Sequence, residues 1–397
     1  MLRMGLPVAT PIDFNDLLEG FKVLLKPNGA LESLREKVRS CTGASHVFAV
    51  NSGRAAIYIA LLAIARRSKR KDVIIPAFIC PSVARAIRKA KLNVILCDIT
   101  PNGFCIDQNA LEKLLVMEPL AVIVPYLFGY PSDINIINEL ASEAKAVVIE
   151  DAAQAFGAQW NNQPVGTRSH IGIFSFGMAK VLSTFRGGLI NVNDETFLED
   201  IEASFYGIAN PGHLSQLLDL CKLVVLSVLS HSQHIKPFIY VWEKKFQRTS
   251  DMDDFDLARY SPAQAAIVQR LMNRLGAITA VRRNNARKIE KGLAGLPGII
   301  IPQVALESSP VYLRFPVVVE DINIKAKLVR KLIQGGINVS QMYNKESFES
   351  VCSLTSYISY YPVTEYLCDR MVNLPTHAYL TERDISTMID IFRSVIS

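Results

Sequence analysis

Short apolar runs alternate with amphipathic segments between residues 30 and 200. Leu31, Leu34 and Val38 share one face of a helical pattern, whereas residues 47–50 form a continuous apolar run. Such runs between helices are typical of a parallel sheet that is covered on both faces. The pattern therefore predicts an α/β domain with a mostly parallel sheet. The expected strands are 47–50, 72–76, 94–97, 121–125 and 146–149, with helices that include 31–42, 54–65 and 81–90.

A long helical pattern at 262–288 leaves this sheet domain, and the chain after it predicts a smaller α+β domain. A chain of 397 residues is long enough for one large and one smaller domain. We place the large domain at 1–255, and the linking helix with the small C-terminal domain at 256–397. The small domain is expected to contain a strand at 311–319, a helix at 325–334 and a terminal helix at 382–394.

One segment of the large domain, 214–230, is nearly all apolar and lies in an insertion at about 210–250. Asp219 and Lys222 interrupt it, and it is shorter than the roughly 20 apolar residues that a membrane span needs. We expect a helix that is buried in a dimer interface or against the sheet. The alternative is a helix lying in a membrane surface, with peripheral contact through 214–245.

Composition argues against several classes of protein. Half of the residues are hydrophobic and 20% are charged, so the chain can bury a large core. The net charge of +6 is scattered without a basic, aromatic-rich stripe, which argues against nucleic-acid binding. His231 and His234 lack a spaced acid or cysteine, so no metal is expected. Seven cysteines without a CxxC pair and the absence of a signal peptide favour the cytoplasm, with membrane association as the alternative.

Three side chains near the middle of the chain suggest a cofactor. Asp151 follows the apolar run 146–149, and Ser175 and Lys180 lie in the next strand and turn. Pyridoxal 5'-phosphate needs a lysine for its Schiff base and an acid that keeps its ring nitrogen protonated. Each residue alone has an ordinary explanation, because an aspartate after a strand often caps a helix and a lone lysine is usually exposed. Their combination predicts a pyridoxal phosphate site.

A second feature fits the phosphate of this cofactor. Ser52-Gly53-Arg54 lies between an expected strand and helix, where glycine lets backbone amides approach an anion at a helix N-terminus. Serine before glycine is also an ordinary helix cap. Ligands of parallel sheets bind beyond the carboxyl ends of the strands. Residues 51–53, 76–80, 125–126 and Asp151 all lie at such ends, so four loops are expected to converge.

These residues resemble the motifs of the DegT/DnrJ/StrS family of pyridoxal phosphate-dependent sugar aminotransferases. The resemblance covers nearly the whole chain, and it implies fold type I, with a mostly parallel sheet in a large domain and a smaller α+β C-terminal domain. Its most specific part is an Asp-Ala-Ala-Gln block followed by a correctly spaced lysine. The matching segments are Asn51-Ser52-Gly53-Arg54-Ala55-Ala56, Glu150-Asp151-Ala152-Ala153-Gln154, Ser175-Phe176 with Lys180, Gly187-Gly188, Tyr260-Ser261-Pro262 and Leu374-Pro375.

The resemblance implies a role for each site residue. Asp151 would pair with the ring nitrogen, Gln154 would bind near the ring hydroxyl, and Lys180 would carry the cofactor and move the proton. Ser175 and the Gly53-Arg54 backbone would hold the phosphate. The family also implies a homodimer in which each active site borrows residues from the neighbouring subunit.

Four positions depart from the family pattern. Cys80 stands where a ring-stacking aromatic residue is usual, and we expect nearby Phe78 to pack in the core. Leu257 stands where an asparagine usually reaches the phosphate of the neighbouring subunit. Arg186 replaces an acid before the Gly-Gly pair, and Tyr126 replaces a histidine. Because the lysine, aspartate and serine are retained, these departures bear on the substrate rather than on the cofactor.

The expected function is the transfer of an amine from glutamate or glutamine to a keto-sugar, nucleotide-linked, in a biosynthetic pathway. Arg54 and Arg186 are candidates to recognise a phosphate or carboxylate. The apolar insertion raises a lipid-linked substrate as a further hypothesis. Two alternatives stay open: a pyridoxal phosphate-dependent dehydratase or lyase on a keto-sugar, and a non-catalytic regulatory protein that keeps the fold. Related dehydratases replace the lysine with histidine, so Lys180 favours transamination.

Overall fold

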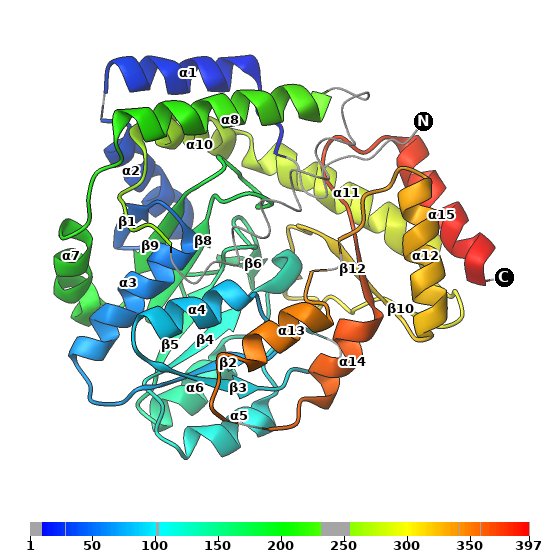
Figure 1. Ribbon diagram of the computed structural model, residues 1–397, viewed down its shortest axis with the longest axis horizontal. Helices are drawn as coiled ribbons and strands as arrows, with labels where there is room; N and C mark the ends of the chain where they lie inside the picture. Colours follow the sequence, from blue (N-terminus) through cyan, green and yellow to red (C-terminus); the bar gives the residue numbers. More distant parts are fainter. Residues whose placement is uncertain are drawn as a thin grey trace.

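The computed structural model describes residues 10–27, 29–100, 103–231, 255–340, 342–357 and 359–396 (Figure 1). Its largest sheet has the strand order β1-β9-β8-β5-β4-β2-β3. β9 is antiparallel to β1 and β8, whereas the other neighbouring pairs are parallel. Every strand except β9 therefore ends at the same edge. The strands are β1 (His46–Val50), β2 (Asp72–Pro76), β3 (Asn93–Cys97), β4 (Ala121–Pro125), β5 (Val147–Asp151), β8 (Ile171–Ser175) and β9 (Gly188–Val192).

Helices cover both faces of this sheet because its strands are apolar on both sides. Val73 and Ile75 of β2 point into one core cluster, while Ile74 between them points into another. This alternation follows from the two-residue period of a strand. The first face carries α3 (Gly53–Arg66), α4 (Pro81–Lys89) and α7 (Leu198–Tyr206), and the second carries α5 (Gln108–Leu115), α6 (Asn135–Glu143), α2 (Ala30–Thr42) and α10 (Pro262–Asn273).

An outer pair of helices, α1 (Phe14–Leu25) and α8 (His213–His231), lies across one side of the molecule (Figure 1). The Ser227 hydroxyl donates to the carbonyl of Ile12 at 3.0 Å, which joins the C-terminal part of α8 to the chain just before α1. The expected helix at 214–230 is present, but its buried side packs on helices rather than on the sheet. Its other side is exposed, with Leu214 at 70% and Val228 at 57%. Residues 232–254, which include the rest of the expected contact segment, lie outside the described residues.

A second core lies around a three-stranded antiparallel sheet in the C-terminal part of the chain. In Figure 1 it lies on the side of the molecule away from α7. Short strands β6 (Gln159–Trp160), β7 (Gln163–Pro164) and β11 (Ser308–Ser309) form a third sheet. The second core is built by β10 (Ile299–Ile300), β12 (Phe315–Val319), β13 (Met371–Leu374), α11 (Leu275–Leu293), α12 (Ile322–Gln334), α13 (Lys345–Cys352), α14 (Pro362–Arg370) and α15 (Glu382–Ile396).

Two expected elements differ in the structure. The helix expected at 262–288 is broken at Arg274 into α10 and α11. The Arg274 side chain binds Asp13 and Asp16 at the start of α1, so the break lies where the helix is anchored to α1. The strand expected at 311–319 begins only at Phe315. Before it, the N–H groups of residues 311 and 313 donate to the carbonyls of a loop, so they make no regular ladder.

The proposed domain division at 255 and 256 stays a prediction. α10 belongs by sequence to the second part but packs in a core cluster with β1, β8 and β9 of the large sheet. Among the helices in the described ranges, none combines the length and the hydropathy needed to cross a bilayer.

Candidate functional site

The carboxyl end of β5 delivers Asp151 to the edge where the parallel strands end. Its side chain is 9% exposed, and its Oδ1 accepts the N–H of Ala153 at 3.1 Å. Burial raises the pKa of Asp151, because water no longer solvates the carboxylate, and nearby Lys180 opposes that shift. Asp151 and Lys180, 29 positions apart in the sequence, are therefore neighbours in the fold.

Lys180 lies in the turn between β8 and β9, and its side chain is half-buried. Ala179 before it has a φ of 60°, a left-handed conformation that is unusual for a residue with a side chain. The Thr10 hydroxyl fixes the turn from outside, because it contacts the carbonyl of Val181 at 3.3 Å and accepts the N–H of Ser183 at 3.0 Å. Burial lowers the pKa of Lys180, whereas the negative charge of Asp151 raises it. A lowered pKa makes the neutral, nucleophilic amine more accessible.

A glycine cradle, which we define as Gly53, Ser175 and Gly187-Gly188, lies beside this pair. A Cβ added to Gly53 would lie 3.1 Å from the Cβ of Ser175, and one added to Gly188 would lie 2.4 Å from the carbonyl carbon of Ser52. At Gly188 no larger residue fits without a shift of the backbone, and at Gly53 a larger residue would press on Ser175. The Ser52 hydroxyl accepts the N–H of Ala55 at 3.1 Å and so begins α3. A helix N-terminus next to bare backbone is suited to hold a phosphate.

The side chain of Arg54 has an aromatic neighbour. Its guanidinium lies over the ring of Phe255 at 5.4 Å, and its backbone lies at the start of α3. Arg186 contacts two acids, Asp219 at 3.6 Å and Asp256 at 3.9 Å. Substrate recognition by Arg186 would have to compete with these acids. Leu257 packs against the core cluster of α3 and α4.

An electrostatic contribution from Cys80 acts to raise the pKa of Lys180, which indicates that the two side chains lie near each other. It is half-buried at the start of α4, with its sulfur 3.0 Å from the Ser82 hydroxyl. Phe78 is 1% exposed and packs on Phe104 and Tyr343, as expected for a core residue.

Gln154 is held at both ends of its amide by the protein. Its oxygen accepts the N–H of Phe128 at 3.0 Å, and its nitrogen donates to the hydroxyl of Tyr343. Tyr343 is 3% exposed and comes from the second core. Sequence reasoning missed Tyr343, because a lone tyrosine before a helix has no signal that separates it from an ordinary core aromatic. It joins the C-terminal part of the chain to the site.

Tyr126 does not face Lys180. Its hydroxyl donates to Glu150 at 2.6 Å, on the other side of β5 from Asp151. Glu150 also accepts backbone N–H groups from residues 166, 168 and 169 at 2.6 to 2.8 Å. Tyr126 therefore has a structural partner in place of a ligand.

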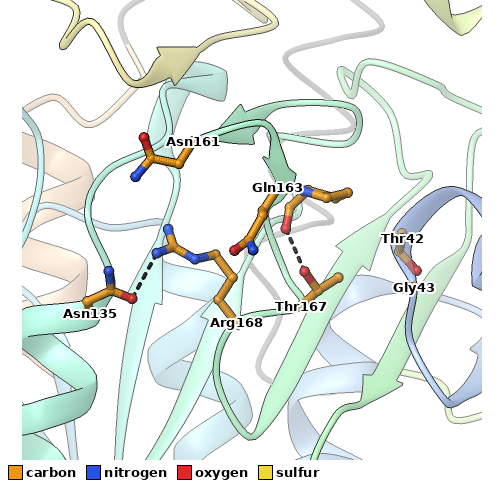
Figure 2. Close-up of a pocket in the computed structure, with 8 residues that line it drawn as sticks. Thr42, Gly43, Asn135, Asn161, Gln163, Thr167 and Arg168 are labelled. Carbon is orange, nitrogen blue, oxygen red and sulfur yellow. Dashed lines mark hydrogen bonds between the residues drawn. The ribbon is translucent and has the colours of Figure 1, made fainter.

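A polar cavity of about 640 Å³ lies on the Glu150 side of the sheet (Figure 2). In it, Arg168 donates to the side chain of Asn135 at 2.8 Å. None of the residues expected to bind a cofactor lines it. The lining residues are Thr42, Gly43, Asn135, Asn161, Gln163, Pro164, Thr167 and Arg168.

Comparisons with known proteins agree on one family. Residues 24–393 match the DegT/DnrJ/EryC1/StrS aminotransferase family. GDP-perosamine synthase of Caulobacter vibrioides is 31% identical over 38% of this chain and 41% of its own length. UDP-N-acetyl-3-dehydro-alpha-D-glucosamine 3-aminotransferase of Acidithiobacillus ferrooxidans is 24% identical over 92% of this chain and 88% of its own length.

The solved structures agree on the fold. The sugar aminotransferase CalS13 of Micromonospora echinospora superposes with a TM-score of 0.80 and 20% identity, covering 98% of this chain and 100% of that one. The predicted fold class is therefore confirmed. For several curated relatives the alignment spans only 41 to 50% of their length.

Proposed function

The chain belongs to the DegT/DnrJ/EryC1/StrS aminotransferase family, and on this premise we propose that it is a pyridoxal phosphate-dependent aminotransferase. It moves an amine from glutamate or glutamine to a keto-sugar, nucleotide-linked, in a biosynthetic pathway. The observation that carries the proposal is the closeness of Lys180 to Asp151 beside the glycine cradle. The substrate class is supported by relatives whose names describe amine transfer to sugars.

The residues present fit the cofactor. The glycine cradle brings backbone without side chains to the N-terminus of α3, which suits the phosphate. Asp151 would hold the ring nitrogen, and Lys180 would hold the aldehyde carbon. When bound, pyridoxal phosphate supplies a ring that withdraws electrons from the carbon next to the amine.

The protein's own residues then divide the work. Asp151 keeps the proton on the ring nitrogen, because a carboxylate next to it favours the cation. Lys180 would take the proton from the donor's α-carbon, and its lowered pKa suits it to act as a base. Gln154 and Tyr343 form a hydrogen-bonded pair that holds the wall of the site. Cys80, which the resemblance puts where an aromatic residue usually stacks on the ring, would offer a small, polarizable contact instead.

Borohydride reduction followed by peptide mass analysis tests the attachment. We expect a stable adduct on Lys180 and on no other lysine. Assays with glutamate, glutamine and a keto-sugar test the reaction, and we expect one 2-oxo acid released for each amine transferred. Cofactor bound without this adduct would refute the role of Lys180. Loss of a hydroxyl from the sugar without release of a 2-oxo acid would show a dehydratase instead.

Assembly and location are part of the same proposal. We expect a homodimer in the cytoplasm, because family members share residues between subunits. The exposed apolar side of α8, which includes Leu214 and Val228, supports the alternative of peripheral membrane contact through 214–245. Light scattering tests the dimer. Flotation with liposomes tests the membrane contact, and protein that stays entirely at the bottom of the gradient would exclude it.

A further inference from the structure

The chain just before β12 brings a buried arginine, Arg314, to the wall of the candidate site. Arg314 is 3% exposed. The N–H of Leu313 donates to the carbonyl of Phe128 at 2.8 Å, and the N–H of Val311 donates to Gly129 at 3.0 Å. These bonds fix the chain against the loop whose Phe128 N–H holds Gln154. Arg314 is therefore placed by two hydrogen bonds next to residues of the site.

The fit between these two segments is tight. A Cβ added to Gly129, whose φ is 80°, would lie 2.6 Å from a methyl of Val311 and 3.1 Å from the carbonyl of Gln154. Only glycine satisfies both the left-handed backbone and the close approach. The position of Arg314 relative to the site is therefore set by backbone packing and not by a flexible loop.

A second arginine, Arg282, donates a hydrogen bond to the backbone of this segment. Arg282 of α11 is 1% exposed, and its Nη1 donates to the carbonyl of Leu313 at 3.3 Å and to the Thr376 hydroxyl at 3.2 Å. Burial lowers the pKa of Arg282 to about 10, and the charge of Arg314 adds to this shift. Two neighbouring guanidinium groups create a strongly positive region, which favours an anion close to them.

The charge of Arg314 affects the pKa values of two side chains in the site, Lys180 and Tyr343. It acts to lower the pKa of Lys180, together with burial, while Asp151 and Cys80 act to raise it. It also acts to lower the pKa of the Tyr343 hydroxyl, which burial raises. Arg314 therefore lies near Lys180 and Tyr343, on the segment that the carbonyls of Phe128 and Gly129 fix against the site.

We propose that Arg314 binds the α-carboxylate of the amino donor and so selects an α-amino acid. The inference deepens the proposed transamination and rests on it. The donor's α-carbon must stand at the nitrogen of Lys180, and its carboxylate is one bond farther away. A guanidinium matches a carboxylate through two parallel hydrogen bonds.

The diphosphate of a nucleotide-linked sugar is the other anion that a guanidinium would bind. It is attached to a different sugar carbon from the ketone, with ring atoms between them. When the ketone reaches Lys180, the diphosphate therefore lies farther from that nitrogen than a donor carboxylate does. The closeness of Arg314 to Lys180 favours the carboxylate.

Separate measurement of the two half-reactions distinguishes the anions. We expect Arg314→Gln to lower kcat/KM for glutamate or glutamine by about 10- to 100-fold, since a hydrogen bond to a charged group is lost. The half-reaction with the keto-sugar should change by less than about 3-fold, within the effect of a distant surface change. Loss confined to the keto-sugar half-reaction would assign the anion to the diphosphate and overturn the proposal.

A donor that lacks the carboxylate gives a matched probe. Isoglutamine is the α-amide of glutamate. With the wild-type protein, its kcat/KM should be lower than that of glutamate by about the factor by which Arg314→Gln lowers kcat/KM for glutamate. The variant should discriminate far less between the two donors. If Arg314→Gln fails to fold, Arg314→Lys keeps the charge and loses the paired geometry, and it should show a smaller loss in the same direction. Undiminished discrimination in the variant would reject the inference.

A readout other than turnover separates a role in the site from a structural role. Arg314→Gln removes a positive charge beside Lys180, so the pH at which the bound cofactor's absorbance changes should rise. Arg283→Gln is the matched control, because Arg283 donates to Pro310 at 2.8 Å and anchors the same segment from another side. It should leave that pH and the donor preference unchanged. If the wild-type protein transfers amine from no donor, the proposed function fails first, and that outcome is distinct from a failure of Arg314 alone.

Discussion

The two sides of the end of β5 carry adjacent carboxylates in opposite situations. Glu150 is fully buried, and it accepts the hydroxyl of Tyr126 and three backbone N–H groups. Asp151 is 9% exposed, and among the described residues it accepts one N–H, from Ala153. A carboxylate offers about four lone-pair sites. The Glu150 region is saturated by the protein, whereas the Asp151 region keeps capacity for a ligand.

This difference separates an acid that the protein saturates from an acid that can still accept a ligand, although both are buried at one strand end. Because successive residues of a strand point to opposite faces, one strand end serves two regions. The Glu150 region ties the loop before β8 to the sheet. The Asp151 region lies next to Lys180, whose pKa is lowered by burial. Substitutions in the first region should change stability, and those in the second should change activity.

Lys180→Ala is expected to have the largest effect. Turnover should fall by at least about 10⁴-fold, because the attachment point and the proton carrier are both lost. The melting temperature of the cofactor-free protein should not fall, since burial disfavours the charged amine. Lys288→Ala is the control, because Lys288 pairs with Glu382 away from the site and should keep full turnover. Undiminished turnover in Lys180→Ala would contradict the assignment of the site.

Asp151→Asn should come next. We expect a fall in turnover on the order of 10²- to 10³-fold, since the group that holds the ring proton becomes neutral. Bound cofactor should still form the adduct with Lys180, which reduction and mass analysis can check. A loss of stability without a loss of turnover would place Asp151 in the same class as Glu150.

Glu150→Gln should show the reverse behaviour. The amide keeps the size but meets three N–H donors with half of the acceptor capacity, so the free energy of unfolding should fall by about 2 to 4 kcal/mol. Tyr126→Phe removes a single hydrogen bond to the same carboxylate and should cost about 1 kcal/mol. Denaturant unfolding measures both. Turnover of the folded fraction should stay near that of the wild type. A fall in turnover as large as that of Asp151→Asn would show that the Glu150 and Asp151 regions do not differ in role.

The smallest expected effect is on pH dependence in the cofactor-free protein. Burial raises the pKa of Asp151 above its ordinary 3.8, so the folded state binds its proton more tightly than the unfolded state does. This contribution to stability is present below that ordinary value and is lost as the pH rises through the raised pKa. Asp151→Asn should therefore gain stability relative to the wild type as the pH rises. Melting curves of both proteins across the acid range measure this difference. A melting temperature of Asp151→Asn that falls relative to the wild type as the pH rises would be the contrary result.

Much of the site was predictable from the sequence. Ser175 and Lys180 lie five positions apart in one strand and the turn after it, and Asp151 ends the strand that pairs with it, so the strand pattern predicts that the three side chains meet at one edge of the sheet. Gly53 could be included because the strand and helix on either side of it are strongly patterned. The same reasoning placed Phe78 in the core, and the structure agrees.

Tyr343 and Arg314 could not be found in this way. Both come from the C-terminal part of the chain and reach the site through contacts with the loop after β4. Neither lies in a motif, and nothing local marks a buried arginine before a strand as part of a site. The helix expected at 262–288 is divided at Arg274, the residue whose side chain binds acids at the start of α1, and that distant contact is not visible in the local pattern.

By itself the sequence determined the alternation of strands and helices, and with it the edge where Asp151 and Lys180 meet. These features depend on local periodicity and on short connections, which residues close together in the sequence determine. Only the tertiary structure decided that Glu150 is saturated while Asp151 is left open, and that Arg314 lies near Lys180. Those outcomes depend on which distant backbone groups and charges arrive at the same place, and a linear pattern does not encode that.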